Sequence, residues 1–137
     1  MTPLHFCRYD IGQGEPLRHK KGDCTVRALA VAAKMPYRNA WQLLYQLQAK
    51  HMHCFFEIFD YLRQEPETFG VIQYLPHPAR RGVPRTTVRE FAMAHPQGRY
   101  IVQAAHHATA VVNGVILDAW DCGRKCIYGA WEIGRKP

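Results

Sequence analysis

Apolar side chains in the first half of the chain recur at intervals of three and four residues, which places them on one face of an α-helix. This pattern predicts a helix over residues 36–50, opened by Pro36 at a position where a helix tolerates proline. Its apolar face consists of Ala40, Trp41, Leu44 and Leu47. An earlier run of good helix formers predicts a helix from Cys24 to Ala33, with Asp23 as its N-cap.

The pattern becomes less regular in the middle of the chain. The run CFFEIFDYLRQE predicts a third helix over residues 54–65, which stops at the next proline. Residues 68–85 hold several prolines and glycines near basic side chains, so we expect a loop there. Thr87 and Glu90 have the spacing of a capping box, which predicts a short helix that ends at Pro96.

The second half of the chain changes to β-branched runs that are typical of strands. These runs cover residues 98–105, 107–112, 115–120 and 126–133. Asn113-Gly114 joins the second run to the third and is a strong signal for a two-residue hairpin turn. Helices followed by an antiparallel sheet indicate an α+β fold, in which N-terminal helices pack on a C-terminal antiparallel sheet.

Length and composition predict one folded domain that spans residues 1–137. Apolar residues make up 47% of the chain and charged residues 21%, which is ordinary for a folded protein with its own core. The N-terminus lacks the apolar core of a signal peptide, and no apolar run is long enough to span a membrane. The five cysteines are odd in number and irregularly spaced, which argues against a disulfide framework. We therefore expect a reduced, cytoplasmic protein, in the host cytoplasm if a phage encodes it.

The net charge of +7 leaves a second class of function open. Basic residues gather at residues 18–21, at Arg80, Arg81 and Arg85, and in the last fifteen residues. Such clusters bind phosphates or steer an acidic partner toward the protein, although they also occur as solvated loops. No run alternates basic and exposed aromatic residues as in single-strand binders, so a nucleic-acid partner is possible but not favoured.

The clearest candidate for chemistry is Cys24, which opens the first helix directly after Asp23. A thiol is a weak nucleophile until it becomes a thiolate, and the free N–H groups and dipole of a helix N-terminus stabilise that anion. The N–H of Cys24 is also placed to hold a developing oxyanion. Asp23 is expected to cap the helix by accepting a hydrogen bond from an N–H two or three residues on.

The hairpin supplies two partners for this thiol. A two-residue loop at Asn113-Gly114 pairs residues whose numbers sum to 227 and places His107, Thr109, Asp118 and Trp120 on one face. His107 then lies diagonal to Asp118, within reach of its carboxylate. A longer loop with a bulge would shift this parity and put His106 in place of His107, so the choice between the two histidines stays open.

These three residues predict a catalytic triad. Cys24 would attack an acyl carbon, and His107 would take its proton and later protonate the leaving group. Asp118 would orient His107 and stabilise the imidazolium. Trp120, on the same face, would shield the bond between His107 and Asp118 from water.

A zinc site is the main competing chemistry. Cys122 and Cys126 are separated by three residues, and His51, His53 and Cys54 lie close together. The loop between Cys122 and Cys126 is basic, which disfavours a cation, and zinc needs four ligands in a tetrahedron. We therefore predict no metal and no cofactor.

The order of Cys, His and Asp, with the Cys at a helix start, resembles the papain-like cysteine peptidases. The segment GDCTVRALA is similar to the Asp-Cys start of the bacteriocin-processing peptidases in that clan. With TVREF, GRYIVQAAHHATAVVNGVILDAWD and YGAW it resembles small proteins of phages and bacterial genomes that bring no known substrate. The likeness covers residues 22–34 and most of 87–131. It implies a papain-like core, a protein or peptide substrate, and Cys24, His107 and Asp118 as nucleophile, base and orienting acid.

The same resemblance implies a glutamine a few residues before the nucleophile, donating to the oxyanion hole. The nearest upstream glutamine here is Gln13, eleven residues back, and Arg18 and His19 stand closer. The hairpin register and the resemblance together favour a thiol-dependent hydrolase of a peptide, isopeptide or other amide bond, whereas the absence of a nearer glutamine favours a non-catalytic protein. Two alternatives remain: a non-catalytic binding or inhibitor protein on the same fold, such as a phage accessory protein, and a basic nucleic-acid-binding protein.

Overall fold

The computed structural model describes residues 5–15, 23–51, 71–78 and 80–134, and these residues form an α+β fold. The helices are α1 (Cys24–Ala32), α2 (Tyr37–His51) and α4 (Val88–Ala94). The strands are β1 (Phe6–Arg8), β2 (Val71–Pro76), β3 (Arg99–Ala104), β4 (His107–Val112), β5 (Val115–Asp118) and β6 (Ile127–Ile133). The helix predicted over residues 54–65 lies outside the described residues.

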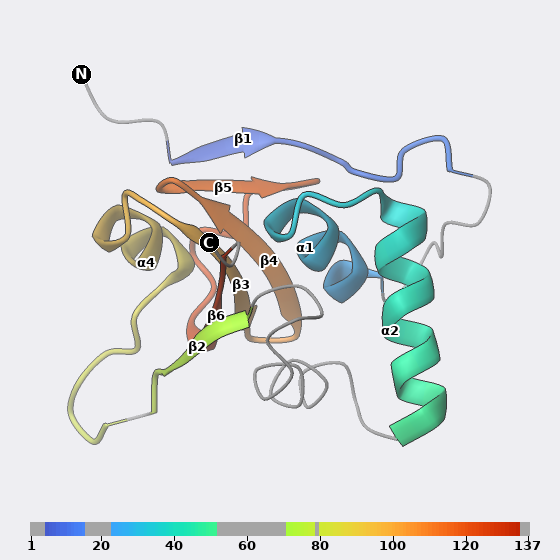
Figure 1. Ribbon diagram of the computed structural model, residues 1–137. Helices are drawn as coiled ribbons and strands as arrows, with labels where there is room; N and C mark the ends of the chain where they lie inside the picture. Colours follow the sequence, from blue (N-terminus) through green and yellow to red (C-terminus); the bar gives the residue numbers. More distant parts are fainter. Residues whose placement is uncertain (1–4, 16–22, 52–70, 79, 135–137) are drawn as a thin grey trace.

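The six strands form one sheet with the order β1-β5-β4-β3-β6-β2. All neighbouring pairs are antiparallel except β1 and β5, which run parallel. Figure 1 shows α1 on one side of the sheet with α2 outside it, and α4 on the other side. The predicted α+β class is therefore confirmed, and α1 packs on the sheet as predicted, whereas α2 packs on α1. The sheet is neither purely antiparallel nor purely C-terminal, because β1 joins it from the N-terminal segment and runs parallel to β5.

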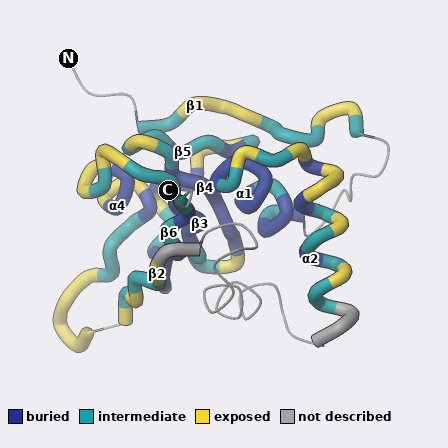
Figure 2. The backbone as a smooth tube through the Cα atoms, in the orientation of Figure 1, coloured by how far each residue is buried: buried dark blue, intermediate teal, exposed yellow. Residues whose placement is uncertain are grey.

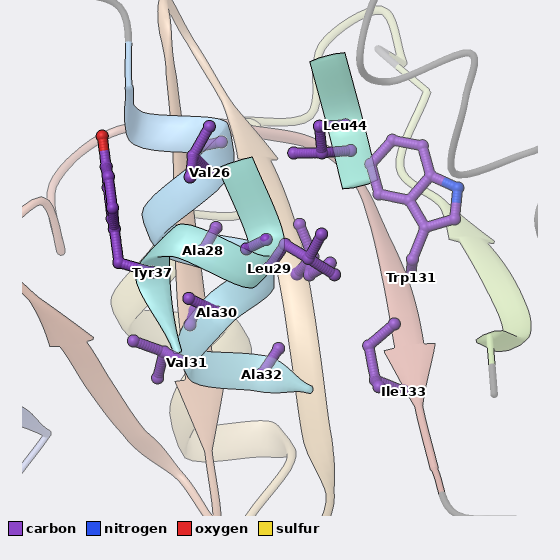
Figure 3. Close-up of a cluster of buried hydrophobic side chains, with 14 residues drawn as sticks. Val26, Ala28, Leu29, Ala30, Val31, Ala32, Tyr37, Leu44, Trp131 and Ile133 are labelled. Atoms are coloured by element: carbon purple, nitrogen blue, oxygen red, sulfur yellow. The ribbon is translucent and has the colours of Figure 1, made fainter. Parts of the chain in front are cut away.

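Helix α1 lies between α2 and the sheet, and its side chains are almost all apolar and small. Seven of its nine residues are buried, because Ala and Val side chains let the helix approach both layers closely. Figure 3 shows Tyr37 and Leu44 of α2 and Trp131 and Ile133 of β6 around this helix. Figure 2 shows the same contrast along the chain: α1 and the central strands are buried, whereas residues 80–84 are exposed.

The C-terminal end of α1 is tied to the sheet by Arg99 at the start of β3. Its Nε donates to the carbonyl oxygen of Ala32 at 2.7 Å, and its Nη2 donates to that of Val31 at 2.6 Å. These carbonyls lack partners inside the helix, and a cation at this end also suits the helix dipole. A single side chain thus holds the last turn of α1 against β3.

Helix α4 covers the opposite face and begins with the predicted capping box. The Thr87 hydroxyl accepts a hydrogen bond from the N–H of Glu90 at 3.2 Å, and the Glu90 carboxylate accepts from the N–H of Thr87 at 3.1 Å. Val88, Phe91 and Ala92 of this helix are buried against the sheet. Helices therefore cover both faces of the sheet, and His107 itself is buried.

The β4–β5 hairpin has the predicted two-residue turn. Asn113 has φ 49° and Gly114 has φ 80°, and two consecutive positive φ angles mark a type I′ turn. Val112 pairs with Val115 and Ala110 with Leu117, so the predicted register is confirmed for this part of the hairpin. The ladder ends there, and Asp118 pairs with Arg8 of β1 instead of with Thr109.

The expectation of a loop over residues 68–85 is wrong for its first part, because Val71–Pro76 form strand β2. This strand is at the edge of the sheet, where only one side of the backbone is hydrogen-bonded and a terminal proline is tolerated. The prolines that suggested a loop mark the end of an edge strand.

No helix among the described residues is long and apolar enough to cross a membrane.

Candidate active site

Cys24 is the first residue of α1 and is half-buried. Asp23 occupies the N-cap position, but its side chain makes no capping hydrogen bond, so the predicted cap is wrong. The carboxylate instead accepts hydrogen bonds from Arg27 and from the hydroxyl of Tyr37, the latter at 3.2 Å. Because Asp23 makes no capping bond, its carboxylate does not occupy the N–H groups of the first turn, and these groups are left to stabilise a thiolate at Cys24.

His107 and Asp118 meet at the open end of the hairpin, as the first residue of β4 and the last residue of β5. The Nε2 atom of His107 is 2.7 Å from Oδ2 of Asp118. Only 8% of His107 and 4% of Asp118 is exposed, so water screens this pair weakly. His106 is exposed in the turn before β4 with φ 54°, so the structure brings His107, and not His106, to the carboxylate.

The thiol of Cys24 joins this pair. Burial raises the pKa of the Cys24 thiol, but hydrogen bonds to His107 and to the backbone of Ala108 and the charge of His107 together bring it below its usual value. The structure therefore brings Cys24, His107 and Asp118 together from a helix start and two neighbouring strands.

The imidazole is strongly biased toward its charged form. Burial lowers the pKa of His107, but hydrogen bonds to Asp118, Cys122 and Cys24 and the charge of Asp118 outweigh it and raise this pKa to about 11. Burial raises the pKa of Asp118, and the bond to the imidazolium of His107 more than reverses this and lowers it. At neutral pH His107 is thus an imidazolium between a carboxylate and a thiol that ionises readily.

Arg27 is a further residue of the site, and its role was not predicted from the sequence. Its guanidinium lies one turn after Cys24, pairs with Asp23, and brings Nη2 to 3.6 Å from Oδ1 of Asp118. The four-residue spacing from Asp23 is a helical ion-pair signal, but the contact with Asp118 depends on how α1 packs on the sheet. Arg27 therefore connects the nucleophile's helix to the acid of the triad.

Cys122 is a second thiol beside the triad. It is 1% exposed, and its Sγ is 3.8 Å from Oδ2 of Asp118. Cys126, which the competing zinc site would have used together with Cys122, is half-buried and paired through its backbone with Thr87. Each of the four described cysteines is a free thiol.

A metal ion could draw ligands from His107, Asp118 and Cys122, whose ligand atoms all lie within 4.8 Å of one another. An ion bound to a ring nitrogen and a carboxylate oxygen at about 2.0–2.1 Å each, with tetrahedral angles, holds them roughly 3.3 Å apart. The 2.7 Å between Nε2 and Oδ2 is the length of a charge-assisted hydrogen bond. The geometry of these residues therefore fits an ion pair better than a metal. The other candidate ligands, His53 and Cys54, lie outside the described residues.

Trp120 covers the pair on one side, as its position on the same face predicts. Its ring centroid is 4.7 Å from that of His107, and the planes are tilted by 42°. Trp120 itself is 45% exposed, so it separates the imidazole from solvent. Gln13, the nearest glutamine upstream of Cys24, is exposed in the turn after β1, and Arg18 and His19 lie outside the described residues.

The basic clusters are only partly described. Arg80 and Arg81 are exposed, whereas the guanidinium of Arg85 lies 4.6 Å from the ring centroid of Tyr128 and donates to the carbonyl of His77 at 3.0 Å. Residues 18–21 lie outside the described residues.

Comparison of the chain with protein-family models, with curated proteins and with solved structures finds no match in any of the three. The chemistry of the site is therefore derived from its own geometry.

Proposed function

We propose that this protein is a thiol-dependent hydrolase of peptide, isopeptide or other amide bonds, built on a papain-like core that spans the chain as one domain. The observation that carries the proposal is the meeting of half-buried Cys24, at the start of α1, with the buried His107–Asp118 pair, whose Nε2 and Oδ2 atoms are 2.7 Å apart. An imidazolium held between a carboxylate and a thiol of lowered pKa is the arrangement that activates a cysteine nucleophile.

Acylation begins from the charged pair, because His107 already carries the proton. The Sγ of Cys24 forms a bond to the acyl carbon, and the carbonyl π electrons move to the oxygen. The N–H groups of the first turn of α1, which Asp23 does not cap, are placed to donate to this oxyanion. When the oxyanion collapses, the carbon–nitrogen bond breaks and His107 gives its proton to the leaving nitrogen.

Hydrolysis then returns the enzyme to its starting state. Neutral His107 takes a proton from a water molecule, whose oxygen attacks the thioester carbon. Collapse of the second oxyanion breaks the carbon–sulfur bond and releases a carboxylic acid and the thiolate of Cys24. Asp118 holds Nε2 of the imidazole by a hydrogen bond and stabilises the positive charge of the ring throughout.

The test is the pH profile of alkylation of Cys24 by iodoacetamide, read by mass spectrometry in wild type and in His107→Ala. Cys7, Cys54, Cys122 and Cys126 report an ordinary or sheltered thiol in the same sample. We expect Cys24 to react fast well below the usual thiol pKa of about 8.5, and the variant to lose this reactivity. If Cys24 reacts no faster at low pH than exposed Cys7, the proposal is wrong and a non-catalytic binding protein becomes the better interpretation.

A further inference from the structure

A cavity of about 240 Å³ lies one side chain away from the His107–Asp118 pair. Trp120, which packs on the His107 ring, and Cys122, whose thiol faces Asp118, both line it. Cys24 does not line it. His107 and Asp118 do not line it either, so Trp120 and Cys122 connect the cavity to this pair.

The lining of this cavity is mainly cationic. Arg89 of α4 and Arg124 and Lys125 of the turn after β5 face it. Both arginines are exposed, and within the described part of the chain neither forms an ion pair with a carboxylate. Lys125 donates to the carbonyl of Ala105 at 2.9 Å and lies 5.8 Å from the ring centroid of Trp120, so its charge is held at the mouth of the cavity.

One acidic group, Asp121, also lines the cavity, but it is already engaged. Its Oδ2 is 3.4 Å from Nε2 of His5, and its Oδ1 accepts from the N–H of Gly123 at 2.9 Å. Three cationic side chains thus face a single carboxylate that has partners of its own. The cavity presents an excess of positive charge and two guanidiniums, whose planar donor groups match a carboxylate.

We propose that this cavity binds a carboxylate on the leaving-group side of the substrate, which makes the enzyme selective for acidic peptides or amides. The inference rests on the proposed function, since His107 delivers its proton to the leaving nitrogen and Trp120, which packs on His107, lines the cavity. The carboxylate is either an acidic side chain just after the scissile bond or a free C-terminus, and both present the same chemistry to Arg89 and Arg124.

The experiment uses chloroacetyl-glutamic acid amide and chloroacetyl-glutamine amide, two probes of nearly equal shape that differ in one charge. Each alkylates Cys24 with loss of chloride and carries its residue toward the His107 side. We expect the glutamate probe to react at least about fivefold faster at low salt, with the advantage shrinking as sodium chloride is added. Chloroacetyl-glutamine with a free C-terminal carboxylate separates the terminal carboxylate from the side-chain one.

The matched variants are Arg89→Gln and Arg124→Gln, which lie outside the triad. In the double variant the ratio of the two rates should fall toward one, while alkylation by iodoacetamide stays as in wild type. Equal rates of the glutamate, glutamine and free C-terminal probes in wild type overturn the inference, and so does a charge preference that survives the double variant. Protection of Cys24 by a single-stranded oligonucleotide, without a difference between the probes, overturns the carboxylate in favour of a phosphate.

The two levels of the proposal fail in different ways. If iodoacetamide labels Cys24 quickly at low pH but the charged and neutral probes react alike, only the acidic selectivity is wrong. If iodoacetamide shows no such reactivity, the thiolate itself is absent and the proposed function is wrong.

Discussion

Two thiols from different regions of the molecule approach the same His107–Asp118 pair. Cys24 begins helix α1 and contacts the imidazole, whereas Cys122 lies in the turn after β5 with its thiol toward the carboxylate. Cys24 is half-buried, and Cys122 is 1% exposed. Both thiols therefore lie close to His107.

The difference shows what a nucleophile needs beyond a nearby base. The thiolate of Cys24 faces a cation and the N–H groups of a helix start, which favour the anion. Cys122 is 1% exposed, lies with its thiol against the carboxylate of Asp118, and is not at the start of a helix. We therefore assign chemistry to Cys24 and packing beside the acid to Cys122.

The largest expected effect separates the two thiols directly. Cys24→Ala should lower the rate of hydrolysis of any peptide substrate by roughly 10⁵-fold or more, because it removes the nucleophile. Cys122→Ala removes only a neighbour of the carboxylate and should change the rate by less than about tenfold. The measurement is kcat/KM on one peptide for both variants, with circular dichroism to compare their folds. Equal losses in the two variants would break the comparison.

The acid shared by both thiols should have the next largest effect. Asp118→Asn removes the charge that stabilises the imidazolium, so kcat should fall by about 10⁴-fold. The pKa of Cys24 should rise, because the cation that lowers it is itself less stable. The pH profile of Cys24 alkylation measures this shift. An unchanged profile in Asp118→Asn would show that the acid does not act through His107.

Stability should depend on pH with opposite signs for the two members of the pair. The folded pKa of His107 is raised to about 11, so its contribution is complete below its usual 6.5 and is lost as pH rises through about 11. The folded pKa of Asp118 is lowered, so its contribution is present above its usual 3.8 and is lost as pH falls through the lowered value. Urea unfolding from pH 7 to 10 should show a decline in wild type.

The matched variant for this measurement is His107→Gln, which keeps a hydrogen-bonding side chain but does not titrate. The difference in unfolding free energy between wild type and His107→Gln should shrink as pH rises from 7 to 10. A difference that stays constant over this range would mean that the charge of His107 does not stabilise the fold.

The smallest of these effects concerns Arg27, which connects the helix of Cys24 to Asp118. Arg27→Met leaves two buried carboxylates without this cation and should lower kcat about tenfold and the free energy of unfolding by about 3 kcal/mol. Arg27→Lys retains the charge and should recover part of both losses. Arg27 is also a cation one turn along α1 from Cys24, so its removal destabilises the thiolate, and the alkylation profile of Cys24 should move to higher pH in Arg27→Met. If Arg27→Met changes the free energy of unfolding but neither kcat nor the alkylation profile, the ion pairs of Arg27 have only a structural role.

The parts of the fold that depend on local signals could be predicted from the sequence. The capping box at Thr87 and the Asn113-Gly114 turn each place their partners within a few residues, and the structure confirms both. The hairpin register follows from the turn, and with it the shared face of His107 and Asp118. This local information was sufficient to bring two of the three candidate residues together.

The remaining features depend on contacts between distant segments. Strand β1 has only three residues, which is too short for a periodic pattern in the sequence to predict it, and it is stabilised by pairing with β5. Asp23 has the residue type and position of an N-cap, yet Arg27 and Tyr37 compete for its carboxylate once α2 packs on α1. Cys122 reaches Asp118 through the turn after β5. These contacts are tertiary, and a sequence read alone does not contain their distances.

The anchoring of α1 by Arg99 has a consequence for catalysis at the opposite end of the helix. An α-helix is a stiff rod that rises 1.5 Å per residue, and Arg99 sets its axial position by holding the last two carbonyls. Sliding the rod by one residue would exceed the tolerance of a hydrogen bond between Cys24 and His107. The alignment of the nucleophile is therefore set about two turns away, because Arg99 fixes the position of Cys24 from the opposite end of α1.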